Sequence, residues 1–422
     1  MKNARENYKI DISNARREAD GYTQAIVARP LAESRSAMLV AFAALVCAIG
    51  WLVTDVQINY AGHLSGLFYT GSNAPLPLGP IASHTWRVQG DKGYDGEFYH
   101  LIAHDPLDRR GFLAYVDSPQ YRWRRIGVPG LAYLLAGGND DWIDKTYVAV
   151  ELVFTFLGSF WLSQYAQALG RAPVWGIAFL LIPGVAVSLD RMTVDLPIAA
   201  VTLAVLFYAS ASQPSWQLYA ALIAAPLIRE TGLLLILAWC LARLLGRYRR
   251  DAILAAACAI PTLAWYLYVA LHTPPDRTAF LATYPFGGLI TWTIHALAHP
   301  VEAYGPRTAA VLELVALAGI WLAFILSAGI AVRWLRGDKN DSFPEIVAIA
   351  FVLFTCLIGY QDIWASAYGI GRTLSPLLIA LCAIALRDRR VILAMPLLLI
   401  VPRIALQFAA EIAVALGIVV RR

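Results

Sequence analysis

Long apolar runs recur along this chain, separated by short polar segments. Examples are residues 37–53, 147–162 and 309–332. A helix needs about 20 mostly apolar residues to cross the hydrocarbon core of a membrane, where the backbone must satisfy its own hydrogen bonds. The runs therefore predict an all-α, multi-pass membrane protein with about ten to twelve transmembrane helices. Membrane-spanning barrel strands would give shorter segments of alternating hydrophobicity.

Composition supports a membrane protein and excludes several other classes. Hydrophobic residues make up 59% of the chain and charged residues 15%, whereas soluble domains carry about 25% charged residues. The net charge is +5, and basic residues gather at the ends of apolar runs, so nucleic-acid binding is not indicated. The cysteines all lie within apolar runs, which predicts neither disulfides nor a thiolate metal site: Cys47, Cys240, Cys258, Cys356 and Cys382.

The distribution of basic residues predicts the orientation. The segment 1–36 is polar and basic, so the positive-inside rule places it in the cytoplasm. It is too long for the start of a signal peptide, and the apolar run after it is expected to be an uncleaved signal anchor. Residues 37–422 then form the membrane domain. Its predicted outer loops are a large first loop, 56–144, and two later loops, 272–307 and 360–372.

The segment 218–245 does not fit a single span, because one span would leave the basic residues after it on the outer side. A break at the sequence PLIRETG restores the orientation. Pro226 and the charged pair Arg229 and Glu230 favour such a break. Near the C-terminus, the run 391–420 fits either one long helix or a hairpin broken at Pro402–Arg403, and the terminal arginines favour the hairpin.

A short helix is predicted directly after Asp95 in the first outer loop. Its apolar residues, Phe98, Leu101 and Ile102, follow at helical spacing, and Pro106 ends the segment. Glu97, His100 and His104 lie on the opposite side, which predicts an interfacial helix with its polar face toward water. These three residues have metal-ligand spacing, but a solvated face is the commoner explanation, and we predict no metal site.

Asp95 itself has two compatible interpretations. It can be the N-cap of this helix, which would lower the pKa of its carboxyl. It can also be a catalytic carboxylate at the membrane boundary.

Charged residues at unusual positions indicate further functional sites. Arg122 and Arg125 are predicted on the outer side, where they suit a substrate phosphate, lipid headgroups or nearby aspartates. Arg229 and Glu230 are expected at membrane depth, where ionisable groups are functional by default, although they could simply neutralise each other. Asp190 lies in a second outer turn, where a helix-end charge can also reach water.

These residues together resemble the GT-C superfamily of membrane glycosyltransferases. More narrowly, the chain is similar to bacterial cell-surface glycopolymer proteins with a YDGQFYY-type motif in the first outer loop. The motif here is Tyr94-Asp95-Gly96-Glu97-Phe98-Tyr99, followed by Ala103, Asp105-Pro106, Tyr121-Arg122, Arg125 and Pro129. A later Arg-Glu-Thr element matches Arg229, Glu230 and Thr231. Glu97 stands where the family usually has Gln, and His100 where a second Tyr is common.

The resemblance implies an inverting glycosyltransferase that uses a sugar linked to polyprenyl phosphate. It would act on a glycan or lipid acceptor at the outer face of a bacterial inner membrane. Asp95 would be the catalytic residue, and some relatives also require a divalent metal. The expected substrate-binding residues are Glu97, Tyr99, Asp105, Tyr121, Arg122, Arg125, Asp190, Arg229, Glu230 and Arg372.

Two other functions fit parts of the same pattern. A secondary transporter would use the broken helix and its charged pair, but it predicts repeated halves, which the sequence lacks. A non-catalytic subunit of a polysaccharide assembly or export complex would retain its function after Asp95→Asn.

Overall fold

The computed structural model describes residues 31–211, 214–275, 282, 284–301, 306–337 and 343–418, and the regular secondary structure of this part is almost entirely helical. The exception is a pair of two-residue parallel strands, β1 (Thr70–Gly71) and β2 (Arg87–Val88). The all-α prediction is confirmed. Of the predicted cytoplasmic segment 1–36, residues 1–30 lie outside the described part, as do Arg421 and Arg422.

Several described helices are long and apolar enough to cross a membrane, which is consistent with a multi-pass protein. Four meet this criterion alone, and up to seven do if each bent pair counts as one span. This is fewer than the ten to twelve predicted, because several apolar runs form short or bent helices. The four are α2 (Leu31–Thr54) with its extension η1 (Asp55–Asn59), α7 (Asp140–Ala168), α12 (Arg249–Ala257) with α13 (Ile260–His272), and α16 (Arg307–Leu335).

The bent pairs and the shorter helices complete the helical body. The pairs are η4 (Pro173–Leu181) with α8 (Pro183–Arg191), α18 (Ala367–Thr373) with α19 (Ser375–Asp388), and α20 (Met395–Gln407) with α21 (Ala409–Ala415). The shorter helices are α9 (Asp195–Ala209), α10 (Trp216–Ile228), η5 (Glu230–Gly232), α11 (Leu233–Leu245), α14 (Gly287–Ala298), α17 (Phe343–Cys356) and η6 (Val391–Leu393).

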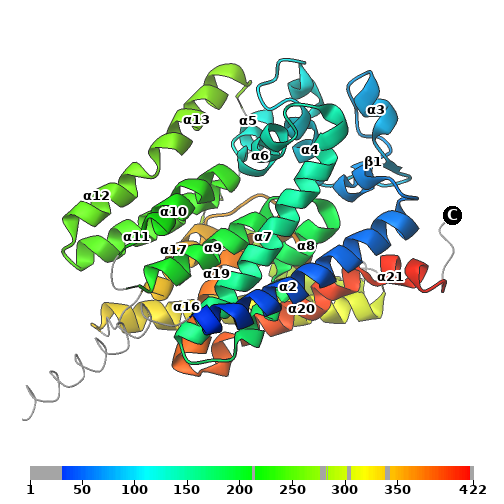
Figure 1. The fold of residues 1–422 in the computed structure, drawn as a ribbon. Coiled ribbons are helices and arrows are strands. Elements are labelled where there is room, and N and C mark those ends of the chain that lie inside the picture. The colour runs from blue at the N-terminus through cyan, green and yellow to red at the C-terminus, as the bar shows by residue number, and fades with distance from the viewer. Residues whose placement is uncertain are drawn as a thin grey trace, which may run out of the picture.

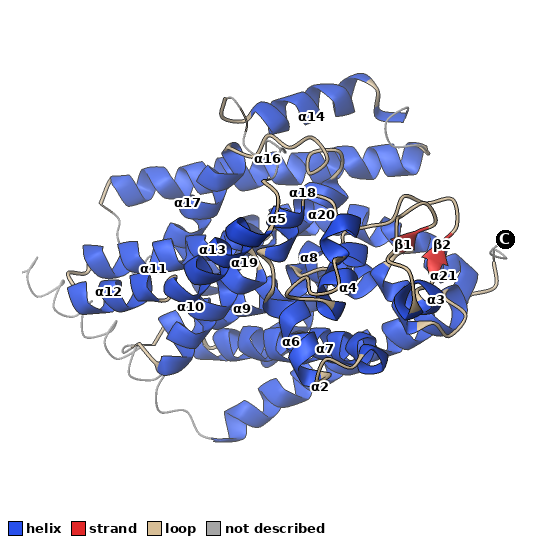
Figure 2. Ribbon diagram, turned by 90° about the horizontal axis from the view of Figure 1, so that it is seen from above, coloured by secondary structure: helices blue, strands red, loops and turns tan. Residues whose placement is uncertain are grey.

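Residues 60–139, most of the predicted first outer loop, form a structured cap. Figure 1 shows the cap in blue and cyan on one side of the helical body, and Figure 2 looks down on it. Besides the two strands it contains η2 (Leu64–Phe68), α3 (Pro80–His84), α4 (Gly96–His104), η3 (Phe112–Tyr115), α5 (Pro119–Trp123) and α6 (Gly127–Leu135). Both α4 and α6 pack on α7, which attaches the cap to the body.

The helix predicted after Asp95 is present as α4, but its polar face does not lie in water. Glu97, His100 and His104 are at most 8% exposed. The ring of His100 stacks on Phe68, with centroids 4.3 Å apart. The expectation of a water-facing polar side is therefore wrong, because α7 covers this face and supplies carboxylates that bind the histidines.

The predicted break at PLIRETG is confirmed. Helix α10 ends before Arg229, whose backbone is extended (φ −151°, ψ 138°), and η5 and α11 follow. Pro226 lies inside α10 rather than at the break. A Cβ on Gly232 would overlap the backbone of Ala225 and Pro226, so the chain folds back tightly against the last turn of α10.

The C-terminal hairpin predicted at Pro402–Arg403 is wrong. Helix α20 continues through Pro402, and the chain bends by 47° only between α20 and α21. Arg403 forms a buried ion pair with Glu313 of α16 (Nε to Oε2, 2.6 Å), which fixes this part of α20 on α16.

The tight turn gives a test of the fold. We expect Gly232→Ala to lower the free energy of unfolding by about 1–3 kcal/mol, because the added methyl group overlaps main-chain atoms. Thermal unfolding in detergent measures this effect. Gly329→Ala, within α16, is the matched control, since a Cβ there meets no atom within 4 Å. Equal melting temperatures for the two variants would contradict the tight packing.

Candidate functional site

Asp95 lies between two arginine side chains from distant parts of the chain. Its Oδ1 is 3.0 Å from Nη2 of Arg122, in α5. Its Oδ2 accepts a hydrogen bond from Nη2 of Arg372, in α18. The carboxylate makes no capping hydrogen bond to α4, although Asp95 occupies the N-cap position. The N-cap interpretation is therefore wrong, and the side chain is available for an ionic site.

Gly96 explains how Asp95 reaches this position. A Cβ on Gly96 would overlap the carbonyl oxygen of Arg191, at the end of α8, and would also crowd that of Phe68. Only glycine allows the first turn of α4 to approach these backbones so closely. In the Asp-Gly pair, Asp95 thus supplies the charged side chain, and Gly96 allows the close backbone approach that places it.

A second ion pair connects the cap to the helix break. Arg125 binds Glu230 through two contacts, Nε to Oε2 at 2.8 Å and Nη2 to Oε1 at 2.6 Å. It also donates hydrogen bonds to the hydroxyl groups of Tyr99 (2.7 Å) and Tyr121. Paired contacts of this kind are among the stronger charge-assisted hydrogen bonds. The sequence-based alternative that Arg229 and Glu230 neutralise each other is wrong.

Arg229 instead binds Asp195, at the start of α9. Its Nη2 also donates to the hydroxyl of Thr373 (3.1 Å), the residue after Arg372. Asp195 in turn lies 3.6 Å from Nη1 of Arg372. The sequence showed Asp195 only as a charge beside a short turn, and its proximity to Arg229 and Arg372 depends on the packing of α9 and α18.

We call these groups the Asp95 cluster. Ion pairs connect six of its members, and the Arg125–Glu230 pair belongs to it through its charges, which act on Asp95 and Arg229. Its positive members are Arg122, Arg125, Arg229 and Arg372, and its negative members are Asp95, Asp117, Asp195 and Glu230.

The cluster has hydrogen-bond donors to spare. In the described part of the chain, Nε and Nη1 of Arg372 and Nε of Arg229 are buried without a hydrogen-bond partner, although Nη1 of Arg372 has the 3.6 Å ion pair with Asp195. Buried donors without acceptors are costly, so these groups favour an additional oxyanion.

The arginines control the ionisation of Asp95. Burial raises the pKa of its carboxyl, but Arg122 and Arg372 outweigh burial and hold the pKa well below its usual range. Asp95 is therefore ionised throughout the physiological range. A carboxylate paired in this way is a weak proton acceptor until its arginines acquire another partner.

Glu97 has the opposite property. Burial raises the pKa of its carboxyl to about 7, against the effect of the backbone N–H of Gly71, which donates to Oε2 at 3.1 Å. The protonated form is therefore present near neutral pH. The charges of Asp117, Arg122 and Asp95 also affect the pKa of Glu97. It thus lies at the edge of the Asp95 cluster rather than in its ion-pair network.

Two other predicted site residues lie apart from the cluster. Asp105 accepts the backbone N–H groups of Arg109 (2.8 Å) and Arg110 (2.6 Å), and so organises a loop of the cap. Asp190 pairs with Arg191 (3.0 Å), which also binds Glu411 of α21 (3.2 Å).

The Asp190 group approaches the cluster through two tyrosine rings in an edge-to-face contact. Tyr368 donates to Asp190 (3.4 Å), and its ring lies 5.8 Å from that of Tyr94. The guanidinium of Arg372 lies over the Tyr94 ring at 4.9 Å.

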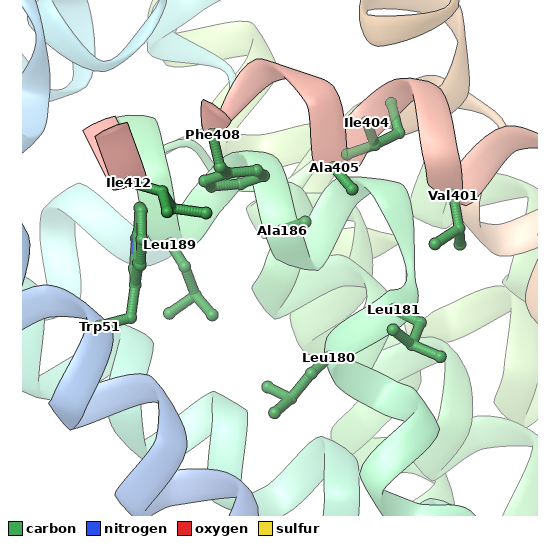
Figure 3. A pocket seen from close by; sticks show the side chains of 10 residues that line it. All are labelled: Trp51, Leu180, Leu181, Ala186, Leu189, Val401, Ile404, Ala405, Phe408 and Ile412. Carbon is green, nitrogen blue, oxygen red and sulfur yellow. The ribbon is translucent and has the colours of Figure 1, made fainter. Parts of the chain in front are cut away.

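An apolar groove adjoins the Asp190 group. It is formed by α2, η4, α8 and the C-terminal helices, and Figure 3 shows its side chains. Two of its lining residues are next to members of the ionic group in the sequence: Leu189 precedes Asp190, and Ile412 follows Glu411. The full lining is Trp51, Leu180, Leu181, Ala186, Leu189, Val401, Ile404, Ala405, Phe408 and Ile412.

Residues with the geometry of metal ligands lie where α4 of the cap meets α7. In the described part of the chain, the grouping that meets this criterion is His100, His104 and Asp144, with ligand atoms within 4.8 Å of one another. The carboxylates of the Asp95 cluster are instead paired with guanidinium groups.

Comparison with protein-family models, with curated proteins and with solved structures found no match.

The pKa of Glu97 predicts a specific pH dependence of stability. The folded protein holds a proton on Glu97 up to about pH 7, whereas an unfolded glutamate loses it near its ordinary pKa of about 4.3. Stability from this group is complete at low pH and falls as the pH rises to about 7. We expect Glu97→Gln to lose less thermal stability than the wild type between pH 5 and pH 8. Parallel melting-temperature profiles would contradict the raised pKa.

Proposed function

We propose that this protein is an integral-membrane glycosyltransferase. It transfers a sugar from a polyprenyl-phosphate donor to a glycan or lipid acceptor on the extracytoplasmic face of a bacterial inner membrane, with its N-terminus in the cytoplasm. The observation that carries the proposal is the position of Asp95 between Arg122 and Arg372, beside buried guanidinium N–H groups without acceptors. A carboxylate and a surplus of donors together match an acceptor hydroxyl and a departing phosphate.

The reaction is a direct displacement. The acceptor hydroxyl oxygen attacks the anomeric carbon, and the bond from that carbon to the phosphate oxygen breaks. The lipid phosphate leaves with the bonding electron pair, and the hydroxyl proton passes to the carboxylate of Asp95. Arg372 and Arg122 stabilise the growing negative charge on the phosphate. One displacement inverts the anomeric configuration.

Binding of the donor phosphate would also change the basicity of Asp95, because the phosphate shares the arginines that pair with this carboxylate. When Arg122 and Arg372 bind the donor phosphate, they share their hydrogen bonds between it and Asp95. The pKa of Asp95 then rises from its depressed value, and the carboxylate becomes a better base. The base is therefore activated in the presence of the leaving group.

The apolar groove supports a lipid-linked donor. Its lining is aliphatic and aromatic, and two of the lining residues, Leu189 and Ile412, are chain neighbours of the buried ionic group of Asp190, Arg191 and Glu411. The carbonyl of Arg191 in turn abuts Gly96, next to Asp95. A polyprenyl chain in the groove would thus bring its phosphate toward the charged residues.

A secondary transporter is the second candidate, because the helix breaks at a buried arginine that is paired with Asp195. Purified protein in liposomes separates the two functions. A transporter moves solute without lipid-linked sugar, whereas a glycosyltransferase consumes that donor.

Replacing Asp95 tests the catalytic assignment. We expect Asp95→Asn to lower sugar transfer by at least about 100-fold, because the amide cannot accept the hydroxyl proton. The assay measures incorporation of labelled sugar in membranes, with the substrate identified from the surface glycans of a deletion strain. Asp141→Asn, an exposed aspartate in the first turn of α7, is the control and should retain activity.

Wild-type activity of Asp95→Asn at normal protein levels would refute the enzyme assignment. It would also favour a non-catalytic subunit of an assembly complex.

Filling the groove tests donor binding. We expect Ala405→Trp to raise the KM for the long-chain donor by roughly tenfold, because the indole occupies space that otherwise holds prenyl units. Ala410→Trp is the matched control. On α21, Ala410 is two residues from Ile412, which lines the groove, so it faces about the opposite way. An equal KM for both variants would exclude this groove as the donor site.

A further inference from the structure

Two histidines and an aspartate meet where α4 packs on α7. His100 and His104 lie one turn apart on α4, and Asp144 lies in the second turn of α7. Side chains four residues apart on a helix share one face. Both histidines are buried, with 2% and 6% exposure. Two imidazole nitrogens and one carboxylate oxygen therefore surround one point, within 4.8 Å of one another.

The hydrogen bonding of His104 points to a cation at this place. Nδ1 of His104 is 2.7 Å from Oδ1 of Asp140, and a carboxylate only accepts hydrogen bonds. In the neutral ring the proton therefore lies on Nδ1, and Nε2 carries a lone pair. That lone pair faces Oδ1 of Asp144 at 3.4 Å. Two acceptors that face each other are stabilised by a positive charge, which either a second proton on the ring or a bound ion supplies.

We propose that His100, His104 and Asp144 bind a divalent transition-metal ion, with zinc as the first candidate. Zinc prefers nitrogen, sulfur and carboxylate ligands in tetrahedral geometry. Asp140 would act as the carboxylate that orients a metal-bound histidine through its other nitrogen. Three protein ligands leave the fourth position of the ion for water or another small ligand.

Two of the three ligand separations are close to the tetrahedral value, whereas the third, between the two histidine nitrogens, is within 4.8 Å and must shorten toward about 3.3 Å. Ligands at about 2.0–2.1 Å from a tetrahedral ion lie roughly 3.3 Å from one another. The separation of His104 Nε2 and Asp144 Oδ1, 3.4 Å, already matches this value. Nε2 of His100 is 2.8 Å from the same oxygen, so the ion must push these two atoms apart by about 0.5 Å.

Neighbouring positive groups do not occupy the point between the ligands. The ammonium group of Lys145 lies over the ring of Trp142, 4.4 Å from its centroid. Arg110 pairs with Asp140, the orienting carboxylate, at 2.9 Å. The cluster borders a polar pocket that also contains His84, which gives an ion a route of entry.

The ion would fix the cap on the helical body. It joins the last two turns of α4 to the start of α7, while Asp95 precedes the first turn of the same helix. Its function here is to position α4, and this function does not depend on which reaction the Asp95 cluster performs.

Metal titration of the purified full-length protein tests the proposal without an activity assay. The protein in detergent is treated with a chelator, dialysed and titrated with Co²⁺. We expect about one Co²⁺ per chain with the visible absorption of a tetrahedral site, and displacement by Zn²⁺. Zn²⁺ should also raise the melting temperature, and the chelator should reverse the shift.

Variants locate the site. We expect His104→Gln and Asp144→Asn to lose the Co²⁺ spectrum and the Zn²⁺-dependent shift. His84→Gln, which alters the same pocket outside the ligand set, should keep both.

Several results would overturn the proposal. They are a wild-type protein that shows neither the spectrum nor the shift, an unchanged spectrum in His104→Gln, and an equal stabilisation by Mg²⁺. If the ligand variants fail to accumulate, the wild-type titration alone decides, because it needs no substitution.

Discussion

The structure of the site depends on the neutralisation of buried guanidinium groups by carboxylates from other helices. An isolated charge in a low-dielectric interior is very costly, and only close pairing with further hydrogen bonds compensates for that cost. Arg125 meets this requirement with Glu230, Tyr99 and Tyr121, and so links the cap to the helix break. Because the pairs Arg125–Glu230 and Arg372–Asp95 each join the cap to the helical body, these charges fix the packing of the cap on the body.

The same neutralisation leaves the site prepared for a negatively charged ligand. Arg372 and Arg229 each keep an N–H group without an acceptor, although both already bind a carboxylate. A phosphate bound beside these groups would gain their free donors. Electrostatic preorganisation of this kind is a major source of rate enhancement in group transfer.

The sequence predicted the local features of the fold and site but not their partners. Helical content followed from the apolar runs, and the break at Arg229 followed from the placement of basic residues. The burial of α4 was missed, because helical spacing shows which residues share a face and not what covers it. The histidines near Glu97 suggested that this face of the helix contacts water. Their actual partners are the carboxylates of Asp140 and Asp144 in α7.

Pair assignments were the least predictable part of the site. Adjacent charges at 229 and 230 suggested mutual neutralisation, but the extended backbone of Arg229 points successive side chains in different directions. Arg229 thus reaches Asp195, and Glu230 reaches Arg125. Fewer described helices meet the length criterion for a span than the sequence predicted for a related reason, since hydropathy does not reveal where an apolar run bends, as it does by 60° between η4 and α8.

The contact between Gly96 and the carbonyl of Arg191 has a mechanical consequence. Helix α8 contributes Ala186 and Leu189 to the groove, and its final carbonyl presses on the residue next to Asp95. Because position 96 has no side chain, the backbones of α8 and α4 are in direct contact there, and a displacement of α8 would also displace the first turn of α4. In the proposed donor complex, the width of the lipid chain in the groove would therefore affect the position of the Asp95 carboxylate without direct contact.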